Sequence, residues 1–99
     1  MDIEYWRMEI DQIDNQLLQL LNMRAALAVN VGVLKRAGGL PVIDPERERE
    51  ILLRVQRCNT GPLDERAITK LFRRIIHESR QIEARTVATV PPRPHEVRP

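Results

Sequence analysis

Two positively charged residues occupy positions of an apolar helical stripe where a leucine or isoleucine would be expected. Arg24 stands between Leu20 and Leu27 in a series of apolar residues spaced by three and four positions. Lys35 follows Arg24 by 11 positions, which is three helical turns, so it shares that face. Because an unpaired guanidinium is costly to bury, the pattern predicts that an anion meets these two cations.

A hydroxyl and an acid interrupt a second apolar stripe in the same way. Ser79 and Glu83 continue an i, i+4 series that starts at Ile75, so they point where the apolar residues of that stripe point. If the helices pack together, this hydroxyl and this acid face the same interior as the two cations.

A third group of polar residues lies at the start of another predicted helix. Asp44, Arg47 and Glu48 share its first turn, and Glu48 precedes the apolar pair Ile51 and Leu52 by three and four positions. The N-terminus of a helix offers backbone N–H groups to anions. Together with the two cations and the hydroxyl, this group predicts a binding site for a small ligand that carries carboxylates and a hydroxyl.

Each of these residues also has a purely structural interpretation. Arg24 could fix the register of helix packing, and Lys35 could complement the dipole at a helix C-terminus. Asp44 could serve only as an N-cap, Ser79 could bond back to its own helix, and Glu83 could lie at the rim. The coincidence of so many polar residues on inward faces favours a functional site.

The residues needed for other kinds of chemistry are missing or isolated. There is no nucleophile with its base, no phosphate-binding loop and no cluster of metal ligands. His77 and His95 stand alone. The one cysteine, Cys58, lies at a helical spacing from Val55 and Ile51, which predicts a buried core thiol. An enzyme built from these residues would act by positioning and electrostatics.

The composition limits the class of protein. With 99 residues the chain is long enough for one domain, and 30% of its residues are charged, with no apolar run of even eight. We therefore expect a soluble protein that does not enter a membrane. Its net charge of +2, from 16 basic and 14 acidic residues, is too balanced for a general nucleic-acid binder. The first residues show no secretory signal, so the expected location is the cytoplasm.

Three helices and no strand are expected to position the polar residues. Apolar residues at steps of three and four predict one long helix from about residue 3 to about residue 37, ended by a pair of glycines. Gly32 inside this helix is expected to cost little stability. Asp44 starts a second helix that ends near residue 59, and Asp64 caps a third.

The chain is expected to form one domain and a dimer. The domain covers residues 1–88, and the proline-rich residues 89–99 are expected to form a disordered or extended tail. The long helix would measure about 50 Å, whereas a compact globule of this size is about 35 Å across. Since two shorter helices cannot cover its apolar stripe, a second copy of the chain is expected to do so, in a homodimer with the long helices paired.

Several segments together resemble the all-α chorismate mutase family. They follow the family's order and spacing over roughly residues 3–87. The matching segments run from Arg7 to Asp14, from Leu17 to Arg24, from Val31 to Lys35, from Pro41 to Glu48, and from Leu71 to Ser79. The leucine-rich helix starts are only weakly specific for the family. The spacing of the charged residues and the serine is strongly specific for it. The resemblance implies an all-α fold of three helices per chain in an intertwined six-helix homodimer.

The resemblance also implies the conversion of chorismate to prephenate, on the shikimate route to phenylalanine and tyrosine. In this family the reaction is a [3,3] rearrangement that needs no cofactor and no covalent intermediate, so the protein holds chorismate in a compact conformation. By the same resemblance, Arg24 and Arg7 bind the two carboxylates with help from Ser79. Lys35 and Glu83 face the ether oxygen, where negative charge develops.

The resemblance assigns the ring hydroxyl of the substrate to Glu48 and to the backbone of Asp44, with Arg47 supporting that cluster. One position departs from the common pattern, because many members carry Gln where this chain has Glu83. An ionised carboxylate there would repel the developing charge, so Glu83 must be protonated to donate a hydrogen bond.

Other interpretations stay open at this stage. An isochorismate pyruvate lyase of the same fold would use similar cations, although such lyases lack the acid found here at Asp44. The chain could also be a non-catalytic helical dimerisation or regulatory domain. A DNA-binding role is disfavoured because no helix is selectively basic. Fusion to another enzyme of the same pathway, or binding to one, is a further expectation.

Overall fold

Three α-helices make up the part of the chain that the structure, a computed structural model, describes, which is residues 2–89. They are α1 (Ile3–Ala37), α2 (Pro45–Cys58) and α3 (Glu65–Thr89), and no strand occurs within these residues. The predicted all-α fold with one long and two shorter helices is therefore confirmed. The predicted tail lies outside the described residues, except for Thr89, which is the last residue of α3.

Aspartates begin all three helices. Asp2, Asp44 and Asp64 each accept a hydrogen bond on a side-chain oxygen from the backbone N–H three positions later, at 2.8 to 3.2 Å. The long helix ends where Gly39 adopts a φ of +68° and the Leu40 N–H returns to the Lys35 carbonyl at 2.8 Å. The helix boundaries thus follow from the capping residues that the sequence provides.

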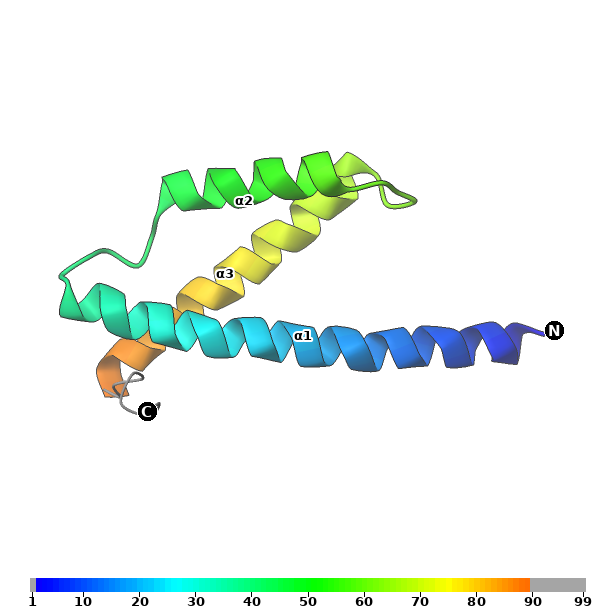
Figure 1. Cartoon of the computed structure of the whole chain (residues 1–99), viewed down its shortest axis with the longest axis horizontal. Helices are drawn as coiled ribbons and strands as arrows, with labels where there is room; N and C mark the ends of the chain where they lie inside the picture. Colours follow the sequence, from blue (N-terminus) through cyan, green and yellow to red (C-terminus); the bar gives the residue numbers. More distant parts are fainter. Residues whose placement is uncertain (1, 90–99) are drawn as a thin grey trace, which may run out of the picture.

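The three helices form an open frame in which α3 is the diagonal (Figure 1). It packs against both α1 and α2, whereas α1 and α2 make only slight contact with each other. The N-terminal half of α1 projects beyond the other two helices (Figure 1), and the chain extends over 54 Å in its longest direction. Its radius of gyration is 16.9 Å, against about 13 Å for a compact domain of this length.

The projecting half of α1 carries an apolar stripe that nothing in this chain covers. Six stripe residues are each between 50% and 60% exposed: Ile3, Trp6, Ile10, Ile13, Leu17 and Leu20. Of the apolar side chains that the structure describes, only Ala28, Ile51 and Ile76 are buried. An unpartnered apolar stripe of this length is typical of a helix that packs against another chain.

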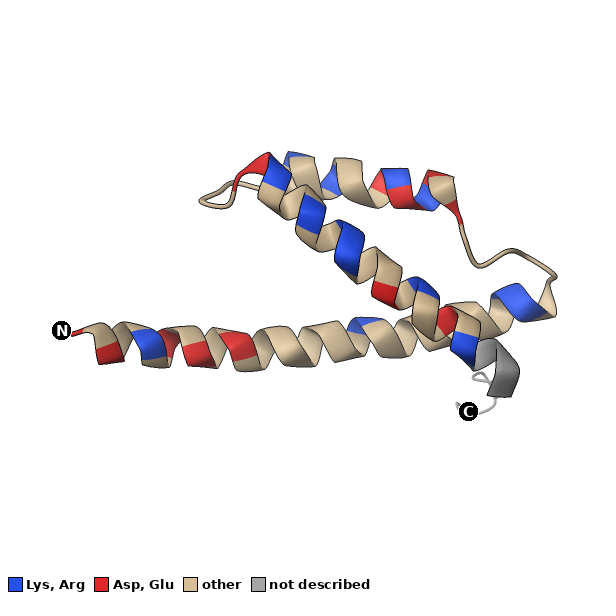
Figure 2. Cartoon of the chain, turned by 180° about the vertical axis from the view of Figure 1, so that it is seen from behind, with Lys and Arg blue, Asp and Glu red and all other residues tan. Residues whose placement is uncertain are grey.

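Charged residues on α1 gather toward its two ends, and in the middle of the helix only Arg24 is charged (Figure 2). As a result, an 18-residue stretch of α1 reaches a mean hydropathy of 1.5, so this helix is long and apolar enough to cross a membrane by length and composition alone. The absence of an unbroken apolar run of eight residues did not reveal this stretch, because single polar residues interrupt it. Helices that pack against other protein segments have the same property, which makes it weak evidence for a membrane.

One predicted core residue lies at the surface. Cys58 is exposed, contrary to the prediction of a buried thiol. Along its stripe, burial falls from Ile51, which is buried, through Val55, which is half-buried, to this last residue of α2. Cys58 does lie in a helix, as its spacing predicted, but the packing of α2 against α3 does not extend over the final turn of α2.

Candidate active site

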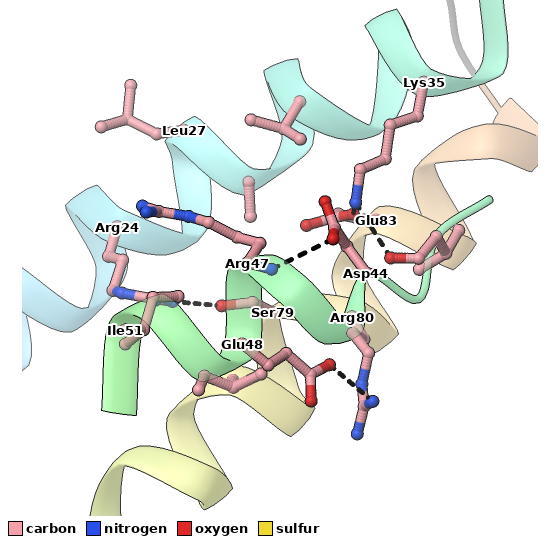
Figure 3. Close-up of a pocket in the computed structure, with 14 residues that line it drawn as sticks. Arg24, Leu27, Lys35, Asp44, Arg47, Glu48, Ile51, Ser79, Arg80 and Glu83 are labelled. Atoms are coloured by element: carbon pink, nitrogen blue, oxygen red, sulfur yellow. Dashed lines mark hydrogen bonds and ion pairs between the residues drawn. The ribbon is translucent and has the colours of Figure 1, made fainter. Parts of the chain in front are cut away.

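A pocket of about 350 Å³ lies between the C-terminal halves of α1 and α3 and the first turns of α2. This volume falls within the range that small-molecule sites occupy. Seven of the eight residues predicted for the site line it (Figure 3): Arg24, Lys35, Asp44, Arg47, Glu48, Ser79 and Glu83. Its apolar walls come from Leu27, Ala28, Val31, Val42, Ile51 and Ile76. The fold thus gathers polar groups from three separate helices around one apolar hollow.

Arg24 joins α1 to α3 on one side of the pocket. Its Nη1 donates a hydrogen bond to Oγ of Ser79, and both side chains are half-buried. Burial lowers the pKa of Arg24, and the positive charges of Arg47 and Arg54 lower it further, whereas Glu83 acts in the opposite direction. The guanidinium stays protonated at neutral pH, so this unfavourable environment favours the arrival of an anion.

Lys35 and Glu83 form an ion pair on the other side of the pocket. Nζ of Lys35 lies 2.8 Å from Oε1 of Glu83 and also donates to the Val42 carbonyl at 2.9 Å. Glu83 is buried, with 8% of its surface exposed. Because an ammonium has three N–H donors, the two bonds to the protein leave one donor for a ligand in the pocket.

The first turn of α2 forms a further wall of the pocket. Oδ1 of Asp44 accepts the backbone N–H of Arg47 at 3.1 Å, so this acid caps the helix as well as lining the pocket. The guanidinium of Arg47 extends toward Arg24 (Figure 3), and its Nη1 lies 3.1 Å from Oε1 of Glu50 at the exposed edge. Arg24, Arg47 and Lys35 are therefore three of the cations that line the pocket.

Arg80 is a residue of the pocket that the sequence interpretation missed. Its Nη1 lies 2.8 Å from Oε2 of Glu48, which ties α3 to α2. A second inward row on α3 could have revealed it, since Ile76, Arg80 and Glu83 follow one another at i, i+4 and i+7. The neighbouring row through Ser79 does not include it.

Arg7 is the one predicted site residue that lies outside the pocket. It belongs to the projecting half of α1, where its side chain is 61% exposed and lies 2.9 Å from Glu4. The 17 positions between Arg7 and Arg24 correspond to about 25 Å along the continuous helix. The chain's own Arg7 and Arg24 therefore cannot contact one small ligand.

The arrangement suits binding and electrostatic chemistry. Within residues 2–89 no group of three His, Cys, Asp or Glu side chains could hold a metal ion. Four cations, one serine hydroxyl and three acids line a hollow with apolar walls, where charges interact more strongly than in water. The pocket can hold a small anion with a hydroxyl and stabilise negative charge beside Lys35.

The same stretch of chain matches a known protein family. Residues 6–84 match the family model described as chorismate mutase type II. The chain belongs to the chorismate mutase type II family. A chorismate mutase from Methanocaldococcus jannaschii is 36% identical over 78 residues, which cover 78% of this chain and 79% of that protein.

Longer relatives contain this family's domain as one part. A bifunctional chorismate mutase/prephenate dehydratase from Aquifex aeolicus is 38% identical over 86 residues, which are 83% of this chain but only 24% of that protein. Among solved structures, chorismate mutase from Helicobacter pylori in complex with prephenate superposes with a TM-score of 0.82 at 28% identity. That match covers 90% of this chain and 97% of the other. The chorismate mutase type II fold thus accounts for nearly the whole chain.

Proposed function

We propose that this chain converts chorismate to prephenate. The observation that carries the proposal is the convergence of seven predicted polar residues, from all three helices, on one pocket. Membership of the chorismate mutase type II family supports it, as does the similarity to a chorismate mutase structure that contains prephenate. In this reaction the ether C–O bond breaks and a C–C bond forms within one molecule, so no group enters or leaves.

The proposed mechanism uses position and charge. The Arg24 guanidinium, held by Ser79, binds one carboxylate of chorismate and keeps the flexible enolpyruvyl arm over the ring. The remaining N–H donor of Lys35 faces the ether oxygen, which gains negative charge as the C–O bond breaks. Glu83 contributes a second donor to that oxygen when its carboxyl is protonated.

The ring hydroxyl of chorismate is assigned to the start of α2. Within residues 2–89, Oε1 of Glu48 accepts no hydrogen bond, so it can accept one from the ring hydroxyl. The backbone at Asp44 lies beside it in the same turn. These contacts orient the ring relative to Lys35.

We further propose a homodimer that completes the pocket. The exposed apolar stripe on the projecting half of α1 supports this, because packing it against a second copy removes six large apolar side chains from water. In such a dimer Arg7 of the partner subunit supplies the second carboxylate ligand. The fusion of this domain with prephenate dehydratase in relatives also supports a partner enzyme that consumes prephenate.

The test is to incubate the purified chain with chorismate and, separately, with isochorismate, without metal or nucleotide, and to identify the products by mass spectrometry and ultraviolet absorbance. Prephenate is expected. Arg24→Ala, purified in parallel, should lose the activity, and Lys70→Ala, on the exposed side of α3, should retain it. Conversion of isochorismate to pyruvate and salicylate would indicate the lyase instead. A folded chain that turns over neither compound would indicate a non-catalytic module.

A further inference from the structure

An ion pair between α2 and α3 forms one edge of the pocket. Nη1 of Arg80 lies 2.8 Å from Oε2 of Glu48, and the two side chains are only 30% and 28% exposed. The exposed pairs of this chain join residues three or four positions apart on one helix, as Arg74 and Glu78 do. The pair between Arg80 and Glu48 joins two helices and is partly shielded from water, so it restrains its two side chains more than an exposed pair on one helix does.

The two oxygens of Glu48 have different surroundings. Oε2 is taken by Arg80, while Oε1 is left without a hydrogen bond from residues 2–89. A glutamate side chain with no partner turns about three bonds, and ordering it on ligand binding costs free energy. Arg80 fixes one oxygen and thereby fixes the position of the other.

Arg80 approaches Glu48 from the edge of the active pocket. Both residues line the active pocket and also a second hollow between α2 and α3, which contains Arg49, Leu52 and Arg73. Figure 3 shows the Arg80 guanidinium on the side of Glu48 that faces away from Arg24 and Lys35. Its charge therefore acts on the ligand mainly through the Glu48 carboxylate.

We propose that Arg80 is a positioning residue that holds Glu48 for the ring hydroxyl of the substrate, and that this pair makes the chain select substrates carrying that hydroxyl. The inference rests on the proposed function. A bound substrate without the hydroxyl would keep water from Oε1 of Glu48 and offer it no hydrogen bond in return, which disfavours that substrate. Arg80 increases the discrimination because it prevents Glu48 from turning away to solvent.

The experiment compares two substrates: chorismate, and an analogue whose ring hydroxyl is replaced by hydrogen. Arg80→Met should lower kcat/KM for chorismate about tenfold, the scale of one charge-assisted hydrogen bond. It should change kcat/KM for the analogue by less than about twofold, so the selectivity ratio falls. Arg73→Met is the matched control, because Arg73 lies two turns earlier on α3 and lines the second hollow but not the active pocket. It should leave both values unchanged.

A double-mutant cycle separates positioning from a general effect on folding. In the Glu48→Ala background, Arg80→Met should cause no further loss with chorismate, because no carboxylate is left to position. Circular dichroism and a melting curve show whether each variant folds. If Arg80→Met does not fold, Arg80→Gln replaces it, and the same fall in the selectivity ratio is expected.

Three other results would contradict the positioning role of Arg80, the selection through Glu48 or the proposed function. Equal losses with both substrates, repeated in the Glu48→Ala background, would mean that the ion pair only ties α2 to α3. A wild-type chain that converts both substrates equally well would exclude selection through Glu48. A wild-type chain that converts neither would refute the proposed function itself, and the inference with it.

Discussion

Gly32 of α1 lies directly against the backbone of Glu83 in α3. A Cβ built on this glycine would stand 3.0 Å from both the Cα and the carbonyl oxygen of Glu83. The two helices therefore cross here at a distance that no other residue permits without movement. Since Lys35 follows Gly32 by three positions on the same face, this crossing sets the 2.8 Å ion pair between Lys35 and Glu83.

We predict that Gly32→Ala destabilises the fold and lowers activity. The added methyl meets backbone atoms, which cannot turn aside as a flexible side chain does, so α1 and α3 must separate by a few tenths of an ångström. Overpacking of this kind costs about 1–3 kcal/mol, and the better helix propensity of alanine offsets up to about 1 kcal/mol of it. Urea denaturation measures the loss of stability, and kcat/KM on chorismate measures the loss of activity.

Gly38→Ala is the control for this prediction. A Cβ at Gly38 would have ordinary contacts, the nearest at 3.5 Å from the Leu34 carbonyl, and the backbone there has a negative φ. This variant should keep its stability and activity. Equal stability of Gly32→Ala and the wild type would show that the helix crossing adjusts freely.

Lys35→Ala tests whether the ammonium stabilises the transition state. Its charge faces the oxygen at which negative charge develops, so its removal should lower kcat at least about 100-fold, the scale for losing one preorganised donor. Arg36→Ala, which removes the neighbouring exposed cation, should change kcat little. Steady-state kinetics on chorismate distinguish the two roles of Lys35. A raised KM with unchanged kcat would assign Lys35 to ground-state binding.

Glu83→Gln tests the role assigned to Glu83. A carboxyl can donate to the ether oxygen only in its protonated form, in which it forms no ion pair with Lys35, whereas an amide always carries N–H donors. Glu83→Gln should therefore keep or raise kcat on chorismate, and Glu83→Ala should lower it. A Gln variant as slow as the Ala variant would remove Glu83 from the mechanism.

The fold and most of the site could be predicted because both follow from local patterns. Apolar steps of three and four placed the helices, and aspartates placed the starts of α2 and α3. Polar residues on those apolar faces, such as Arg24 and Ser79, marked the interior that the helices share. Each of these signals depends only on residues within one or two turns.

Features that depend on how helices cross could not be predicted in the same way. Gly32 was expected to cost little, whereas its contact with Glu83 sets the geometry of the pocket. The inward position of Arg80 follows from its helical row, but its bond to Glu48, 32 positions away on another helix, does not. Cys58 was assigned to the core because its stripe does not reveal where the packing ends. These are tertiary relationships that helical periodicity does not contain.

The last prediction concerns the proposed sharing of the pocket between two chains. Because Arg7 and Arg24 lie about 25 Å apart on one helix, a single chorismate can contact both only if Arg7 comes from the partner. Arg7→Ala and Arg24→Ala homodimers should therefore each be nearly inactive. Either substitution spoils both pockets of its dimer, through the donated arginine in one case and the resident arginine in the other.

Mixing the two inactive proteins should restore activity. In a mixed dimer, the pocket on the Arg7→Ala chain keeps its own Arg24 and receives an intact Arg7, whereas the other pocket loses both. Random pairing makes half of the dimers mixed, each with one complete pocket of two, so about one quarter of wild-type activity should return by two-fold symmetry. The proteins are unfolded and refolded together, because intertwined chains exchange slowly, and native mass spectrometry counts the mixed dimers. If mixed dimers form and no activity returns, Arg7 serves its own chain or no pocket at all.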